Sequence, residues 1–120
     1  MFSASCHCGA IRLQVSFAPG HVISCNCSIC RRYGALWAQY EPTAIVLVAS
    51  VDDLVEYVWG ERTIRTQRCR HCGCVTHWEP IGADAGQVVG INMRNFDPDL
   101  IRDIPVRRFD GAESWTYLDA

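Results

Sequence analysis

Apolar and polar residues alternate along several short stretches of the chain, which is the pattern of half-buried β-strands. The clearest stretch is residues 11–17, where isoleucine, leucine, valine and phenylalanine are separated by arginine, glutamine and serine. A period of two places these apolar side chains on one face of a sheet. Pro19 and Gly20 follow, and this pair ends the predicted strand because both residues favour turns.

The rest of the pattern predicts more short strands and one short helix. Residues 55–59 and 63–68 flank Gly60, which predicts a hairpin. The helix signal lies at residues 97–101, where Asp97 is placed to cap a helix whose first position is proline. Further strands are expected at residues 35–40, 45–49, 75–78 and 88–93. Many short strands separated by glycine and proline predict an all-β fold.

Length and charge narrow the function classes. The 120 residues suit one domain, residues 1–120, with a modest core. A net charge of −2 does not provide the excess of positive charge that attracts nucleic acid or an anionic membrane, so neither is an expected partner. No apolar run is long enough to span a bilayer, and the N-terminus lacks the features of a signal peptide. The expected location is therefore the reducing cytoplasm.

The candidate chemistry lies in the cysteines. Seven of the eight form three clusters, which are Cys6 and Cys8, then Cys25, Cys27 and Cys30, then Cys69 and Cys72. A tetrahedral zinc site takes four ligands, and the two outer pairs supply four. The middle cluster is one ligand short. Three cysteines with an open fourth position are typical of a catalytic zinc.

Disulfide bonds are the alternative use of eight cysteines, because small secreted domains are often cross-linked in this way. The absence of a signal-like N-terminus argues against it. Cysteines one or two positions apart also chelate metal more readily than they bridge. Gly73, directly after Cys72, permits the tight turn of a zinc knuckle. The spacing therefore favours metal.

The positions of the clusters suggest different roles for two Zn²⁺ ions. Cys6 and Cys8 precede the first predicted strand, whereas Cys69 and Cys72 follow the second strand of the hairpin. A zinc that joins them closes a loop of about sixty residues and links metal binding to folding. These four cysteines are therefore the expected structural site. The central triplet, with three ligands, is expected to hold its zinc less tightly.

The order of the motifs resembles that of a known family. Cys-His-Cys-Gly-Ala begins at Cys6, Cys-Asn-Cys-Ser-Ile-Cys-Arg-Arg at Cys25, and Cys-x-x-Cys-Gly at Cys69. Together they are similar to the glutathione-dependent formaldehyde-activating enzyme (GFA) family, which is related to centromere protein V. The resemblance runs from Ser5 to about Phe109. It implies a β-sheet fold of the β-tent type, akin to zinc ribbons.

The resemblance also implies an activity. In the family the outer cysteine pairs bind a structural zinc and the central triplet binds the catalytic zinc, which matches the division suggested by spacing. The family condenses glutathione with formaldehyde to S-hydroxymethylglutathione and is classed as a carbon–sulfur lyase. Glutathione is therefore the expected small-molecule partner, while a related thiol or another aldehyde stays open. Arg31 and Arg32 are candidates to bind the carboxylates of glutathione, and solvated arginines are the alternative.

A zinc-stabilised binding module without catalysis is the alternative function. Such a module has no need of a three-cysteine site, so the triplet favours the enzyme. Cys74 is either a free buried thiol, as unpaired cysteines commonly are, or a fourth ligand that closes the central site. His77 and Glu79 are candidates for proton transfer, although plain strand residues are the simpler interpretation.

The remaining polar and aromatic residues have structural interpretations. Two histidines lie within the cysteine motifs, at His7 and His71, and are expected to be spacers that point away from the metal. The tryptophans are expected to build the core, because a small β-domain needs large side chains to bury enough area. The four tryptophans are Trp37, Trp59, Trp78 and Trp115. Asn92, Arg94 and Asn95 end a predicted strand and are expected to cap a loop.

Overall fold

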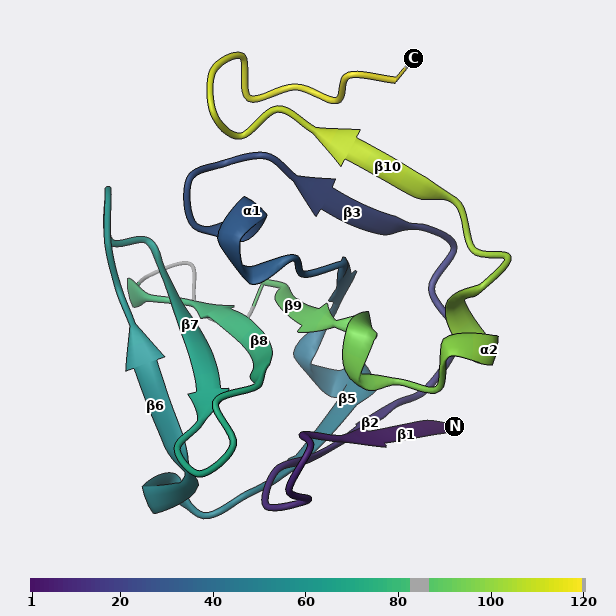
Figure 1. Cartoon of the computed structure of the whole chain (residues 1–120), viewed down its shortest axis with the longest axis vertical. Coiled ribbons are helices and arrows are strands. Elements are labelled where there is room, and N and C mark those ends of the chain that lie inside the picture. The colour runs from purple at the N-terminus through teal and green to yellow at the C-terminus, as the bar shows by residue number, and fades with distance from the viewer. Residues whose placement is uncertain (83–86, 120) are drawn as a thin grey trace.

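A computed structural model of the chain, which describes residues 1–82 and 87–119, consists mostly of short strands in two sheets (Figure 1). The smaller sheet has the order β1-β2-β5 and the larger has the order β10-β3-β4-β9-β8-β7-β6. The smaller sheet contains β1 (Phe2–Ser5), β2 (Arg12–Val15) and β5 (Ile45–Val48). The larger contains β3 (Val22–Cys25), β4 (Trp37–Tyr40), β6 (Leu54–Tyr57), β7 (Ile64–Cys69), β8 (Val75–Pro80), β9 (Val89–Asn92) and β10 (Val106–Phe109). The predicted all-β fold is confirmed.

The described part of the chain has two short α-helices rather than the one expected. Helix α2 (Pro98–Ile101) is the predicted one, and the Asp97 side chain accepts a hydrogen bond from the Asp99 backbone N–H at 2.9 Å. Helix α1 (Cys30–Tyr33) has no side-chain cap at its start, so the sequence carried no start signal for it. The short 3₁₀ turns are η1 (Pro42–Ala44), η2 (Val51–Asp53) and η4 (Met93–Asn95).

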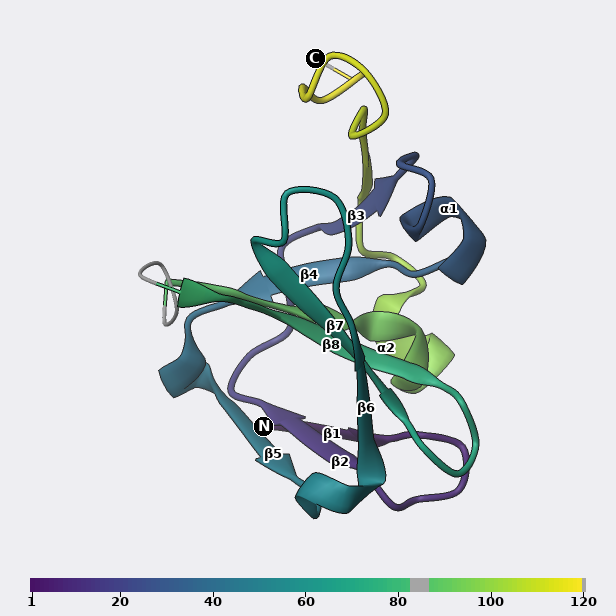
Figure 2. The ribbon, with the colours of Figure 1, turned by 90° about the vertical axis from the view of Figure 1, so that its left-hand side faces the viewer.

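The main core lies between the two sheets, which form separate layers (Figure 2). Leu13 and Val15 of β2 are almost fully buried and pack in one cluster with residues of β4 and β9, such as Ala38 and Ile91. The alternation along residues 11–17 therefore points Leu13 and Val15 into this core, as predicted, whereas Ile11 is buried in a separate cluster with Cys6 and Cys69. Phe17, beyond the end of β2, is 56% exposed and falls outside the pattern.

The opposite face of the larger sheet carries a second apolar cluster. Trp37 on β4 and Trp78 on β8 belong to it together with Ile23 of β3. Gly90 on β9 lies beside Trp78 in the sheet register. A Cβ atom built on Gly90 would lie 1.9 Å from the indole nitrogen of Trp78, so the ring packs directly on the glycine backbone. Trp78 can occupy this place only because residue 90 has no side chain.

Gly90→Ala is therefore expected to destabilise the domain by about 1–3 kcal/mol, because the new methyl group must displace the half-buried Trp78 ring. Urea denaturation followed by circular dichroism measures the loss. Gly20→Ala is the matched control, since a Cβ at Gly20 meets nothing within 4 Å. Equal stability of the two variants would contradict the packing described here.

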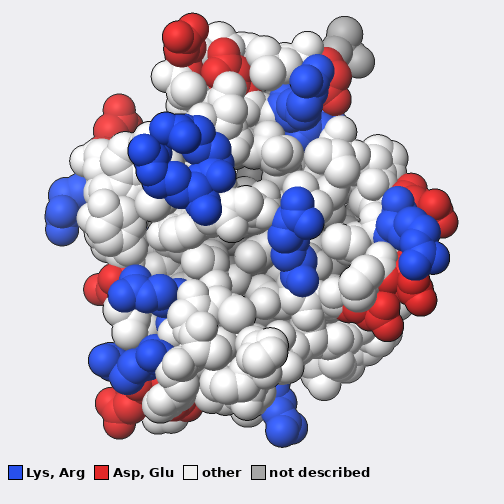
Figure 3. Space-filling view, viewed as in Figure 1, with Lys and Arg blue, Asp and Glu red and all other residues white. Residues whose placement is uncertain are grey.

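Charges are mixed on the surface. On the face that Figure 3 shows, arginine and acidic side chains lie scattered among uncharged residues rather than in one basic patch. Within the described ranges, no helix combines the length and the apolar character needed to cross a bilayer.

Candidate metal centres

The first centre consists of the four cysteines of the outer motifs. The Sγ atoms of Cys6, Cys8, Cys69 and Cys72 all lie within 4.8 Å of one another. The Sγ–Sγ distance is 3.7 Å between Cys6 and Cys8 and 3.6 Å between Cys8 and Cys69. Four sulfurs bound to one tetrahedral zinc at about 2.3 Å are about 3.8 Å apart. The cluster could therefore hold a zinc ion with little movement of its side chains.

The backbone near each outer cysteine pair, residues 6–11 and residues 69–73, is folded around these sulfurs. Cys69 and Gly73 are joined by a backbone hydrogen bond of 2.9 Å, and Gly73 has a φ of 80°, which is favourable for glycine alone. The N–H of Ile11 donates to Cys6 Sγ at 3.3 Å, and the N–H of His71 donates to Cys69 Sγ at 3.4 Å. Such N–H groups stabilise negative charge on sulfur, which a metal ligand requires.

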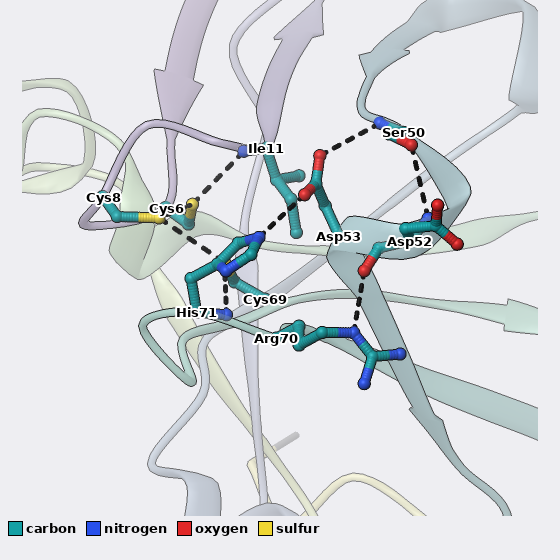
Figure 4. Close-up of polar contacts among 9 residues, drawn as sticks. All are labelled: Cys6, Cys8, Ile11, Ser50, Asp52, Asp53, Cys69, Arg70 and His71. Carbon is teal, nitrogen blue, oxygen red and sulfur yellow. Dashed lines mark hydrogen bonds and ion pairs between the residues drawn. The ribbon is translucent and has the colours of Figure 1, made fainter.

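Turn η2 is hydrogen-bonded to the turn that contains the second cysteine pair, residues 69–73 (Figure 4). The His71 ring is hydrogen-bonded to Asp53 at 2.8 Å, and the Arg70 guanidinium donates to the Asp52 carbonyl at 2.7 Å. The bond to His71 holds the pKa of Asp53 below its ordinary value. His71 thus points toward η2 and not toward the sulfurs. Ser50 and Asp53 form a capping box, which is a local sequence signal for this turn.

The second centre is the central triplet. Cys25 ends β3, Cys30 begins α1, and Cys27 lies in the loop between them. Their Sγ atoms lie within 4.8 Å of one another, and no other histidine, cysteine or carboxylate among the described residues joins the group. The interaction between the Cys25 and Cys30 side chains lowers the pKa of Cys25 and raises that of Cys30. Three converging cysteine sulfurs suit a soft cation such as Zn²⁺.

A hollow of about 870 Å³ opens beside the triplet, and we call it the aromatic hollow. Cys25, Cys27 and Cys30 form part of its wall. The rings that line it are those of Trp37, Trp59, Trp78, Phe109, Trp115 and Tyr117. The expectation that the tryptophans build the core is confirmed for Trp37 and Trp78, which pack with Ile23, and is wrong for the exposed Trp59 and Trp115. The sequence did not show this because the rings come from strands and loops that meet only in the folded chain.

A smaller hollow of about 250 Å³ touches the triplet as well, and we call it the basic hollow. Arg31 and Arg94 line it together with Cys25 and Cys30. Arg32 lines neither hollow, and its guanidinium donates to the Ser28 carbonyl at 2.6 Å. The two arginines considered in the sequence thus have different surroundings. Arg94 was expected only to cap a loop, and its guanidinium does bond the Gly34 carbonyl.

The two asparagines near Arg94 do cap their loop. The Asn92 side chain accepts from the N–H of Leu36 at 3.3 Å and donates to the Val75 carbonyl at 2.9 Å. Asn95 donates to the same carbonyl at 2.9 Å. These bonds tie the end of β9 to the start of β4 and β8.

Three further candidates lie away from the triplet. Cys74 is half-buried and packs against the four-cysteine cluster. His77 is buried beside Thr76, to which its ring is hydrogen-bonded at 2.8 Å, and burial lowers its pKa. Glu79 accepts a hydrogen bond from Gln67 at 3.1 Å. His77 and Glu79 line neither hollow, so the structure does not bring them to the triplet.

The C-terminal segment, residues 109–119, contributes a part of the site that the sequence analysis missed. A Cβ atom on Gly111 would lie 2.7 Å from Cys25 Sγ, so the backbone passes directly over the triplet. The Asp-Gly pair at 110–111 is a turn signal. Nothing local in the sequence indicates that this turn lies against Cys25.

Comparisons with known proteins agree with the motifs. A family model described as glutathione-dependent formaldehyde-activating enzyme matches residues 1–108. The fold is similar to the crystal structure of a Rhodobacter sphaeroides protein, with a TM-score of 0.70 and 29% sequence identity. That match covers 87% of this chain and 98% of the other. The chain belongs to the glutathione-dependent formaldehyde-activating enzyme family.

Proposed function

We propose that the protein is a zinc-dependent carbon–sulfur lyase that joins a thiol, glutathione or a close analogue, to an aldehyde. The observation that carries the proposal is the central triplet. Its three sulfurs converge within 4.8 Å, no fourth ligand comes from the described residues, and a large hollow opens beside it. A purely structural metal site is closed by four ligands, whereas a catalytic site keeps one position for substrate.

The two centres then have different roles. Cys6, Cys8, Cys69 and Cys72 hold a structural zinc, and Cys25, Cys27 and Cys30 hold the catalytic one. When bound, a zinc with three thiolate ligands supplies a weak Lewis acid that favours the thiolate form of an incoming thiol. A reducing cytoplasm, in which thiols stay free, is the compartment that suits both centres.

The reaction needs little more than orientation. The sulfur of the thiol attacks the carbonyl carbon, a carbon–sulfur bond forms, and the carbonyl electron pair moves to oxygen. The proton released by the thiol ends on that oxygen, so S-hydroxymethylglutathione is the product when the aldehyde is formaldehyde. The part played by this chain is to hold the two reactants at the triplet in a reactive orientation. Arg31 binds a carboxylate of the thiol from the basic hollow, where its side chain lies beside Cys25 and Cys30.

Cobalt-substituted protein titrated with glutathione tests this function, because the thiolate-to-metal charge-transfer band reports a new sulfur ligand. We expect the band to change in the wild type, and the affinity to rise with pH toward the pKa of the thiol, since binding releases a proton. Arg31→Ala should weaken glutathione by about 1–3 kcal/mol. Arg32→Ala is the matched control and should change it little, because Arg32 is bonded to the Ser28 carbonyl.

Cys74→Ser tests whether the fourth position is open. The titration of this variant should match that of the wild type, because Cys74 packs against the other cluster. A band that stays unchanged in the wild type but responds to glutathione in Cys74→Ser would contradict the open site. That result would favour a binding module without catalysis.

A further inference from the structure

We infer that the physiological substrate is the adduct of the thiol with a bulky, aromatic or similarly large apolar aldehyde, whose side group occupies the aromatic hollow. This inference rests on the proposed function and extends it to the class of aldehyde. It follows from the size and the lining of two hollows that both border the triplet.

The size of the aromatic hollow is the first argument. Formaldehyde has two heavy atoms and needs a volume close to that of one water molecule, about 30 Å³. The hollow has about 870 Å³, in the range of pockets that enclose whole ligands. Formaldehyde would fill only a small part of this space, which leaves room for the apolar group of a larger aldehyde. A thiol adduct with a ring or a long alkyl group fills more of it.

The lining is the second argument. Trp59 is 41% exposed and Trp115 is 71% exposed, although both face the same hollow. Two large rings left open to water gain free energy when an apolar group covers them. Glu61 is the one described residue of the lining with a formal charge, apart from cysteine thiolates. A carboxylate of the thiol is therefore disfavoured in this hollow, and an uncharged apolar group is favoured.

The third argument is that Trp115 is held in place by an ordered turn. Its φ is 59°, a left-handed conformation that costs energy for a residue with a side chain. Its N–H donates to the Asp110 carbonyl at 2.7 Å, and the Asp110 carboxylate accepts from the Ser114 hydroxyl at 2.8 Å. The ring packs edge-on against Phe109, with 5.1 Å between centroids. A backbone conformation of this kind persists only when its surroundings enforce it, so the turn places Trp115 at the edge of the hollow, where its ring packs on Phe109.

The same turn is hydrogen-bonded to the loop that contains Cys25 and Cys27. Asn26 lies between Cys25 and Cys27, and its side-chain amide donates to Asp110 at 3.0 Å. The side-chain oxygen Oδ1 of Asn26 in turn accepts a hydrogen bond from the N–H of Ala112 at 3.0 Å. Residues 109–119 thus place Trp115 at a defined distance from the triplet. They lie beyond residues 1–108, which the family model matches.

The two hollows together define how a substrate is oriented. Cys25 and Cys30 line both of them. With its sulfur at the triplet, an adduct can extend its carboxylate toward Arg31 and Arg94 and its apolar group toward Trp59 and Trp115.

In the reverse direction of the reaction, the carbon–sulfur bond breaks with its electron pair on sulfur, and the hydroxyl proton transfers to that sulfur. The products are the free thiol and the apolar aldehyde.

Calorimetric titration of the zinc-loaded protein with S-benzylglutathione and S-methylglutathione tests the inference. The two probes share every charged group and differ only in the apolar substituent. We expect S-benzylglutathione to bind at least about tenfold more tightly, because its ring covers exposed indoles. Trp115→Ala and Trp59→Ala should each remove most of this preference, with little effect on S-methylglutathione.

Phe17→Ala is the matched control, since Phe17 is an exposed aromatic residue that lines neither hollow. It should keep the preference, and circular dichroism should show native folding of all three variants. Equal affinity of the two probes for the wild type, or a preference that survives both tryptophan variants, would overturn the inference.

The cobalt titration separates this inference from the function on which it rests. If glutathione changes the cobalt spectrum but the two probes bind equally, the apolar substrate class is wrong and the thiol chemistry stands. If the benzyl preference depends on Trp115 and Trp59 while glutathione leaves the spectrum unchanged, the apolar binding site stands and the thiol chemistry is wrong.

Discussion

Cys69→Ser is expected to yield an unfolded or insoluble chain. Cys69 is fully buried, and its sulfur lies 3.6 Å from that of Cys8, 61 residues away in the sequence. A structural zinc held by thiolates contributes an apparent binding energy on the order of 10 kcal/mol. The stability of a whole domain is about 5–15 kcal/mol, so loss of this metal is enough to unfold it.

The position of the cluster in the fold is the physical reason for so large an effect. Cys6 and Cys8 lie between β1 and β2 of the smaller sheet, whereas Cys69 ends β7 of the larger sheet. A metal bound by these cysteines would connect the two sheets at one end, where the β1–β2 and β7–β8 loops lie side by side (Figures 1 and 2). Without it, the core between the sheets loses the link that closes a long loop.

Circular dichroism and thermal melting of purified Cys69→Ser and Cys6→Ser measure the effect. Cys74→Ser is the matched control, because its thiol packs against the same cluster without being one of the four converging sulfurs. It should melt close to the wild type. Native-like melting of both Cys69→Ser and Cys6→Ser would show that these cysteines do not hold a structural metal.

The sequence predicted the fold where local pattern decides it. Alternation located β2, and the Gly60 turn located the hairpin of β6 and β7. It did not reveal β1, β3 or β10, each four residues long. β10 pairs with β3 in parallel, with Val106 opposite Val22. Such a pairing joins distant segments and leaves no short-range signal, so only the folded chain shows it.

The candidate site divides in the same way. Ligand spacing is local chemistry, and it identified both groups of converging sulfurs before the structure was known. The walls of the hollows are set by tertiary contacts. Asn26 and Asp110 are 84 residues apart, and their hydrogen bond places Gly111 over Cys25. Asn26 lies within the central cysteine motif and Asp110 within a turn signal, but neither pattern indicates that the two residues pair, so the closeness of the C-terminal segment to the triplet was not predictable from the sequence.

The second large effect concerns activity rather than folding. Cys27→Ser is expected to keep the fold, to lose one equivalent of zinc and to abolish thiol-dependent activity. Cys25, Cys27 and Cys30 lie within six positions of the sequence, so their metal closes almost no loop and restrains the unfolded chain little. Each of the three is only half-buried, and none belongs to the main core between the sheets.

Metal analysis of the purified variant, together with its melting curve, tests this separation of roles. The zinc content should fall by one equivalent relative to the wild type, while circular dichroism and the melting temperature change little. Cys30→Ser is a stricter companion, because Cys30 also begins α1 and packs beside Trp37. It should lose the same metal with a somewhat lower melting temperature. A Cys27→Ser protein that unfolds as completely as Cys69→Ser would show that the central metal also maintains the fold, and that the two centres are not divided as proposed.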